Sequence, residues 1–169
     1  MDEYSIEEWF QQYERDITSF LVYYTGSQEV EDLVQDTFLI ALQKLSKFNG
    51  ASHPKTWLIS IARNRVIDLY RRKKVWERII NVLVTDQPFS GDIEQGMVKN
   101  FDHIHLNKAI HQLAPKYKEV IILRGILELS SEETSTILHC SKNKVNVMYH
   151  RSLKKVREIL EEEGFIYGR

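Results

Sequence analysis

The chain has 169 residues, of which 43% are apolar and 28% charged, with a single cysteine and a formal net charge of −1. This length allows one domain or two small ones, and the apolar content excludes global disorder. One cysteine excludes an internal disulfide and fits a reducing cytosol, while the acidic amino terminus lacks the basic residues of a signal peptide. No apolar run approaches the ~20 residues that span a bilayer. We therefore expect a cytoplasmic protein without membrane insertion of its own.

The small net charge hides an uneven distribution of charge along the chain. Residues 1–50 hold 3 Lys or Arg against 10 Asp or Glu, whereas residues 53–78 hold 8 against 2. Residues 111–169 hold 10 Lys or Arg against 8 Asp or Glu. The acidic front suits a basic or polar protein partner, and the two basic segments suit the phosphates of a nucleic acid.

The front of the chain predicts three helices. Residues 4–24, residues 29–48 and the stretch from Pro54 to about Lys74 carry apolar side chains at three- and four-residue steps. Pro54 suits the first turn of a helix, and the residues before it, 48–53, predict a loop. No alternating strand pattern is present in this block, so we expect an all-α fold.

Residues 79–102 change character and predict a linker between two small helical domains, 1–78 and 103–169. The turn-forming groups Asp86-Gln87-Pro88 and Ser90-Gly91-Asp92 interrupt any helical stripe. The apolar run from Ile79 to Val84 is unusual for a linker. It either prolongs the preceding helix or packs against another part of the protein.

The last third of the chain predicts helices over residues 103–113, 115–127, 131–139 and 142–162. Ser130 to Glu133 form a capping box, in which a serine hydroxyl and a glutamate satisfy the free amides of a helix start. A break at His139-Cys140-Ser141 separates this helix from a second one, whose cations are Lys142, Lys144, Arg151, Lys154, Lys155 and Arg157. A capped helix, a tight turn and a basic helix predict a helix-turn-helix that binds the DNA major groove.

Two surfaces in the front block are candidates for binding. Asp32, Gln35, Asp36 and Leu39 fall on one face of helix 29–48, where they form either a docking site for a basic protein helix or a solvated face. In the helix that follows Pro54, cations interleave with aromatic residues as they do in proteins that bind single-stranded nucleic acid. Trp57 either stacks on a base there or packs in the core. The loop with Asn49 suits an extruded base.

Taken together, these patterns resemble a known family over nearly the whole chain. The front block, with Glu31-Asp32-Leu33-Val34-Gln35-Asp36-Thr37-Phe38 and then Phe48-Asn49-Gly50 through Tyr70-Arg71, resembles the sigma-two domain of extracytoplasmic-function (ECF) sigma factors of the bacterial sigma-70 family. Leu113-Ala114-Pro115, Val120 to Arg124 and Leu129 to Arg157 resemble the sigma-four domain of the same family. The resemblance implies a factor that binds core RNA polymerase and starts transcription at specific promoters.

The resemblance also implies roles for individual residues. Docking on the clamp helices of the largest catalytic polymerase subunit falls on Asp32, Gln35, Asp36 and Leu39. Recognition and opening of the −10 element falls on Phe48, Asn49, Gly50, Ser52, His53, Trp57, Arg63, Asn64, Arg71, Arg72 and Lys73. Reading of the −35 element falls on Ser141, Lys142, Lys144, Asn146, Val147, His150, Arg151 and Lys154. An anti-sigma factor is the expected regulator, and the run from Ile79 to Val84 is either its contact or a local packing surface.

The proposed −35 helix departs from the family. Where the family commonly follows a Thr-Val step with a basic residue, a serine and an arginine, this chain has Lys144-Val145-Asn146-Val147-Met148. Asn146 can form a bidentate contact with adenine, and Val147 can touch only a thymine methyl or pack. Val145, Met148, Leu153 and Val156 are expected in the core, so the −35 base preference does not transfer from the family.

Other classes of protein have weaker support. His103, His105, His111, His139 and Cys140 lack the spacing of zinc sites, and no nucleophile, phosphate-loop or dinucleotide motif indicates an enzyme. We expect no metal and no cofactor. One alternative is a stand-alone transcription regulator with a sensory front domain, which predicts a ligand cavity in residues 1–75. Another is a docking adaptor whose basic helices contact acidic partners.

Overall fold

The computed structural model describes residues 4–83 and 101–165, and every regular element in those two ranges is helical. The all-α prediction is therefore confirmed. The elements are α1 (Ile6–Thr25), α2 (Glu31–Lys44), η1 (Leu45–Lys47), α3 (Pro54–Leu83), α4 (Phe101–His111), α5 (Pro115–Ile121), the π-helical turn η2 (Ile122–Ile126), α6 (Ser131–Leu138) and α7 (Lys142–Glu162). None of these helices combines the length and the hydropathy that crossing a bilayer requires.

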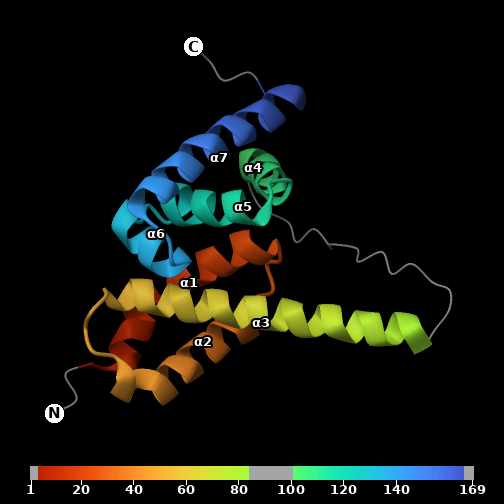
Figure 1. Ribbon diagram of the computed structural model, residues 1–169. Coiled ribbons are helices and arrows are strands. Elements are labelled where there is room, and N and C mark those ends of the chain that lie inside the picture. Colours follow the sequence, from red (N-terminus) through yellow and green to blue (C-terminus); the bar gives the residue numbers. More distant parts are fainter. Residues whose placement is uncertain (1–3, 84–100, 166–169) are drawn as a thin grey trace.

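The first domain consists of α1, α2 and the first half of α3, drawn red to yellow in Figure 1. The Ser5 side chain accepts the amide of Glu8 and so caps the start of α1. Gly26 ends α1 with φ +77°, a left-handed conformation that favours glycine. The apolar faces of the three helices meet in a core that includes Phe20, Leu21, Phe38 and Leu58.

The second domain consists of α4 to α7, drawn green to blue in Figure 1. The predicted capping box is confirmed, because Ser130 accepts the amide of Glu133 and the Glu133 carboxylate accepts the amide of Ser130. His139 ends α6 in the left-handed conformation, and the Ser141 side chain caps α7 by accepting the amide of Lys144. The chain therefore turns tightly between α6 and α7, as predicted for a helix-turn-helix.

Helix α3 is longer than the sequence indicated, and its far half leaves the body of the protein (Figure 1). We expected it to end near Lys74, which is wrong, since it continues to Leu83. The described part of the apolar run at 79–84 thus prolongs α3, and three of its side chains, Ile79, Ile80 and Val82, are exposed, as is Trp76 before it at 63%. Helical residues occupy both ends of the predicted linker, and residues 84–100 lie outside the described ranges.

The two domains pack against each other through helices from both sides. The first half of α3 contacts α6, which lies beside it in Figure 1, and α1 contacts η2. Apolar residues of both domains, from Ile6 to Val66 and from Ala109 to Leu160, belong to one continuous buried cluster. The structure is therefore a closed arrangement, in which part of α3 lies under the second domain.

Candidate polymerase- and DNA-binding surfaces

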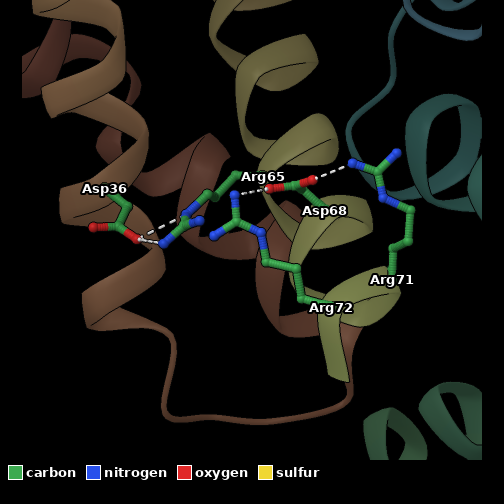
Figure 2. A network of polar contacts seen from close by, with 5 residues as sticks. All are labelled: Asp36, Arg65, Asp68, Arg71 and Arg72. Carbon is green, nitrogen blue, oxygen red and sulfur yellow. Dashed lines mark hydrogen bonds and ion pairs between the residues drawn. The ribbon is translucent and has the colours of Figure 1, made fainter. Parts of the chain in front are cut away.

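Three of the four predicted polymerase-docking residues are exposed on α2. Asp32 and Gln35 are exposed, and Leu39 is an exposed apolar side chain at 57%. Asp36 is only partly exposed, because its Oδ2 accepts hydrogen bonds from Nε and Nη2 of Arg65 at 2.9 and 2.7 Å. Figure 2 shows this ion pair joining α2 to α3. Asp36 is therefore already engaged in a contact between two helices.

The predicted −10 loop, residues 48–53, has a defined local geometry. The Asn49 side chain accepts the amide of Ala51 at 3.0 Å, which closes a turn around Gly50. Gly50 has φ +71°, and a Cβ there would lie 3.0 Å from the Tyr4 hydroxyl, so only glycine suits the position. His53 is exposed and accepts the amide of Lys55 through Nδ1 at 3.2 Å, while Ser52 is half-buried. The loop thus presents Asn49 and His53 at the surface.

Aromatic side chains pack together behind this loop. The Trp57 ring lies 4.9 Å from Phe48 and 6.0 Å from Trp9 between centroids, and Phe48 lies 5.0 Å from Tyr4. Trp57 and Phe48 are both half-buried. These contacts support the core-packing alternative for Trp57, and a role for it in stacking on a base stays a prediction.

The predicted −10 cations of α3 mostly have acidic partners. Arg71 and Arg72 both reach Asp68, at 2.7 and 3.1 Å, as Figure 2 shows. Lys73 lies 3.9 Å from Glu77, and all three cations remain well exposed. Asn64, about two turns earlier on α3, is also exposed. Exposed pairs of this kind within one helix are worth only a few tenths of a kcal/mol and exchange readily for phosphate contacts.

Arg63 differs, because its partner belongs to the other domain. Its Nε donates to Oε1 of Glu119 at 2.9 Å and its Nη2 donates to Oε2 at 3.2 Å. The exposed fractions of the two side chains are only 18% and 12%. This two-bond geometry is the one that guanidinium groups adopt with carboxylates and phosphates alike.

Two further side chains complete the surroundings of Glu119. The Tyr24 hydroxyl donates to Oε1 of Glu119 at 2.9 Å, and Lys118 Nζ donates to the backbone carbonyl of Tyr24 at 3.1 Å. Burial raises the pKa of Tyr24, and the Glu119 carboxylate raises it further, so the phenol remains a donor. Burial lowers the pKa of Lys118, an effect that the charge of Glu119 partly offsets.

A second carboxylate of the helix-turn-helix domain faces the start of α3. Oε1 of Glu133 accepts a long hydrogen bond of 3.5 Å from Thr56, while the same side chain serves the α6 capping box. Burial raises the pKa of Glu133, but hydrogen bonds from Ser130 and the charges of Lys55 and His53 outweigh it. Its pKa therefore lies below the ordinary value. The charge of the predicted −10 residue His53 thus acts on an acid of the second domain.

The predicted −35 residues lie on the outer face of α7. Ser141, Lys142, Lys144, Asn146, Val147, His150, Arg151 and Lys154 are all exposed. Lys142 reaches Glu132 at 3.2 Å, and Lys154 lies 3.9 Å from Glu158. Within residues 4–83 and 101–165, Lys144 and Arg151 form no ion pair.

The inner face of α7 mostly agrees with the sequence. Val145, Met148 and Val156 are buried, as predicted. Leu153 was also expected in the core, which is wrong: it is 44% exposed. It lies at the rim of an open groove between α4, η2 and α7, so the neighbouring helices do not cover it.

Several residues with defined roles in these surfaces escaped the sequence analysis. Glu119 and Tyr24 act across the domain contact, Arg65 holds Asp36, and the Ser131 hydroxyl lies 2.5 Å from Oδ1 of Asn146. Each partner is distant along the chain, so no local spacing signals the pairing. Among the described residues there is no cluster of three or more His, Cys, Asp or Glu side chains that suits a metal ion.

Comparison with known proteins assigns both domains. Residues 9–75 match the family described as Sigma-70 region 2, and residues 105–156 match Sigma-70, region 4. The chain is 35% identical to the ECF RNA polymerase sigma factor SigX of Bacillus subtilis over 173 residues, which cover 94% of this chain and 88% of SigX. It is 33% identical to the RNA polymerase sigma factor YlaC of the same species, over 91% of each chain.

Solved structures agree on the fold. The sigma factor RpoE, solved in complex with the anti-sigma factor NepR from Bartonella quintana, matches with a TM-score of 0.74 at 23% identity, over 92% of this chain and 96% of RpoE. CnrH, solved in complex with the cytosolic domain of CnrY, matches with a TM-score of 0.69 at 21% identity, over 93% of this chain and 88% of CnrH. With both regions matched in order along the chain, this protein belongs to the ECF family of RNA polymerase sigma factors.

Proposed function

We propose that this sigma factor docks on core RNA polymerase through α2 and engages promoter DNA through the 48–53 loop, α3 and α7. The observation that carries the proposal is the presence of two helical domains, matched in order to region 2 and region 4, with exposed cations on α7. The sigma-factor family is not a class of enzymes, so binding free energy rather than covalent chemistry directs the polymerase. The stand-alone regulator is not favoured, because it leaves the region 2 match without a role.

In this proposal, α7 sets the position of the protein on the −35 duplex. Its exposed cations neutralise phosphates and release counterions, which makes binding sensitive to salt. Asn146 and Val147, also exposed, meet base edges in the major groove. The base preference then depends on these two side chains, which distinguish the helix from the family pattern.

The first domain supplies the −10 contacts. Extruding a base costs a few kcal/mol, and capture in a protein pocket offsets that cost. Asn49 is exposed on a loop whose shape the Ala51 amide and Gly50 fix, so its amide is available to a flipped base. Arg71, Arg72 and Lys73 hold the backbone of the opened strand.

Docking on the clamp helices of the largest polymerase subunit falls on Asp32, Gln35 and Leu39, with Asp36 contributing from its pair with Arg65. The proposed site of action is the cytoplasm, together with the polymerase. We also propose control by an anti-sigma factor, a partner class supported by the fold shared with RpoE, which was solved with the anti-sigma factor NepR.

Reconstituted transcription tests the proposal. Core polymerase of Bacillus subtilis is combined with the purified chain and a library of duplexes randomised upstream of a reporter transcript, and start sites are mapped. Core with the chain should start transcripts at sites that share two spaced motifs, and core alone should not. Tight, specific duplex binding by the chain alone, with no gain for core, would contradict the proposal.

A charge reversal on α2 tests the proposed docking face. Asp32→Arg should abolish core binding without loss of fold, because the Asp32 side chain is exposed and forms no ion pair among the described residues. Asp36→Arg is a poorer variant, since it would set two arginines against each other at the α2–α3 contact. If Asp32→Arg binds core polymerase with unchanged affinity, this face of α2 is not part of the docking site.

A further inference from the structure

The first turn of α6 reaches the start of α7 through two side-chain contacts. The Ser131 hydroxyl donates to Oδ1 of Asn146 at 2.5 Å, and Glu132 lies 3.2 Å from Lys142. Asn146 and Lys142 both belong to the first two turns of α7, the part of a recognition helix that meets base edges. The preceding helix therefore acts directly on residues that are proposed to read the −35 element.

The length of the Ser131–Asn146 contact fixes which atom of the amide points to the hydroxyl. An O–H···O bond spans about 2.5–3.0 Å and an N–H···O bond about 2.7–3.2 Å, so a separation of 2.5 Å fits the amide oxygen and not the NH₂ group. The amide oxygen can only accept hydrogen bonds, and the NH₂ group can only donate them. With Oδ1 turned to Ser131, the two N–H donors of Asn146 face away from Ser131.

The backbone that carries the Ser131 hydroxyl is firmly held. Ser131 lies inside the capping box from Ser130 to Glu133, and both hydrogen bonds of that box are formed. Beside it, Ile137 of α6 and Val145 of α7 are fully buried where the two helices contact each other. Ser131 is half-buried, whereas Asn146 is exposed. A donor fixed in this way selects one orientation of an amide that solvent would otherwise leave free to turn.

This orientation is incompatible with the adenine contact that the sequence indicated for Asn146. Bidentate recognition of adenine needs Oδ1 to accept from N6 while Nδ2 donates to N7, so both atoms must face the base. Guanine presents two acceptors, N7 and O6, and thymine presents O4. Adenine and cytosine each present an NH₂ donor, which opposes the NH₂ group of Asn146. An asparagine that offers only donors therefore favours guanine, and then thymine, over adenine.

We propose that Ser131 determines base specificity at the −35 element: by holding Oδ1 of Asn146, it makes Asn146 a donor-only reader that selects guanine in place of adenine. Ser131 is a positioning residue, since it acts through Asn146 without contacting a base. The inference rests on the proposed function, because it takes α7 as the helix in the major groove. It adds to that function a base preference at one position and the residue that sets it.

Single-base substitution of the −35 element tests the inference in the complete transcription complex. A promoter mapped with this chain and Bacillus subtilis core polymerase is prepared with all four base pairs at each −35 position, and transcription from each is measured at limiting factor. The position that Asn146 reads is the one whose base preference disappears in Asn146→Ala. There the wild-type chain should favour guanine over adenine by about 2- to 5-fold, the effect of one exposed hydrogen bond.

Three variants of α6 separate positioning from folding. Ser131→Ala removes the hydroxyl and should raise transcription from the adenine promoter to at least that from the guanine promoter, because Oδ1 can then face the base. Ser131→Thr keeps a hydroxyl and should retain the wild-type preference. The matched control, Ser135→Ala, removes a hydroxyl of the same helix that donates to the backbone carbonyl of Glu132, and should also retain it. All three keep the capping box, so each should unfold in urea as cooperatively as the wild type.

Side-chain NMR of the free chain tests the contact in the absence of DNA. Asn143 is an internal reference, because it is exposed on the same helix and forms no side-chain hydrogen bond within the described residues. The NH₂ group of Asn146 should be more ordered on the ps–ns timescale than that of Asn143. Ser131→Ala should remove this difference. Equal order of the two amides in the wild-type chain would overturn the inference.

The transcription results separate the inference from the proposed function. The inference is overturned by a wild-type preference for adenine at the Asn146 position, by a Ser131→Ala profile identical to that of the wild type, or by an Asn146→Ala profile that is unchanged at every position. In each of these cases specific transcripts would leave the proposed function standing. Failure of the wild-type chain to start any specific transcript with core would instead overturn the proposed function, and the base preference with it.

Discussion

Two cations in the first half of α3 and two cations of α7 have similar chemistry and opposite surroundings. Arg63 and Arg65, in the first half of α3, are largely buried and bound to carboxylates of other helices. On α7, Lys144 and Arg151 are exposed and form no ion pair among the described residues. The comparison teaches that a basic helix is not by itself an available DNA-binding surface. For Arg63, availability depends on the position of the second domain, whereas Arg65 is held by Asp36 of its own domain.

The largest expected effect concerns stability. Arg63→Ala leaves the buried Glu119 carboxylate without its cation and should lower the free energy of unfolding by about 2–3 kcal/mol. Arg151→Ala removes an exposed side chain and should change it by less than about 0.5 kcal/mol. Urea unfolding of the full chain measures both. Equal losses would remove the distinction between the two helices.

The second effect concerns DNA affinity. Arg151→Ala should weaken −35-dependent promoter binding by the polymerase complex by about 1–3 kcal/mol if Arg151 contacts a base. If Arg151 contacts a phosphate, the loss is similar on unrelated −35 sequences and the salt slope falls by about one. Competition binding at several salt concentrations separates the two modes. No loss on any promoter would place Arg151 outside the interface.

A smaller effect is expected from Ser131. Its hydroxyl donates to Oδ1 of Asn146 at 2.5 Å, at the short end of the range for an O–H···O bond, and so holds the side-chain amide with its NH₂ group away from Ser131. Ser131→Ala should therefore relax base selection opposite Asn146 at a cost below about 1 kcal/mol. Selection of bound promoters from a library randomised at the −35 element measures this base preference directly. An unchanged preference would show that Asn146 needs no such support.

The last effect is a pH dependence of the free energy of unfolding. His111 lies against Gly26. Burial lowers the pKa of His111, and the charge of Lys118 lowers it further. A hydrogen bond with the Tyr23 backbone raises the pKa but does not outweigh these two causes. Below about pH 6.5, His111 binds a proton in the unfolded chain but, because its pKa is lowered, not yet in the folded chain. Stability is therefore complete above that pH and falls as the pH drops below it. Urea unfolding of His111→Gln between pH 7.5 and 5.5 should lack this component, and an identical pH dependence would refute the assignment.

Local signals in the sequence predicted the helices well. The capping box from Ser130 to Glu133, Pro54 and the turn at His139 depend on neighbours within one helical turn, so their pattern is visible in the chain. The end of α3 was missed, because the run of cations after Tyr70 looks like a terminal turn, whereas nothing in residues 75–83 breaks a helix.

The candidate surfaces were predictable only in part. Their exposed members on α2 and α7 follow from the periodicity of the apolar face, which leaves the opposite side to solvent. Pairings across the molecule did not follow, since Arg63 and Glu119 are brought together by the packing of two domains. Leu153 was misplaced for the same reason, because its burial depends on how far α4 and η2 cover α7.

Arginine side-chain NMR of the free chain tests the central claim most directly. The Nε–H group of Arg63 donates within a buried pair, whereas Arg151 is exposed on α7. We predict slow exchange of the Arg63 Nε–H with water, fast exchange for Arg151, and fast exchange for both in Glu119→Gln. Equal, fast exchange of Arg63 and Arg151 in the wild-type chain would contradict the account, because α3 would then be as accessible as α7.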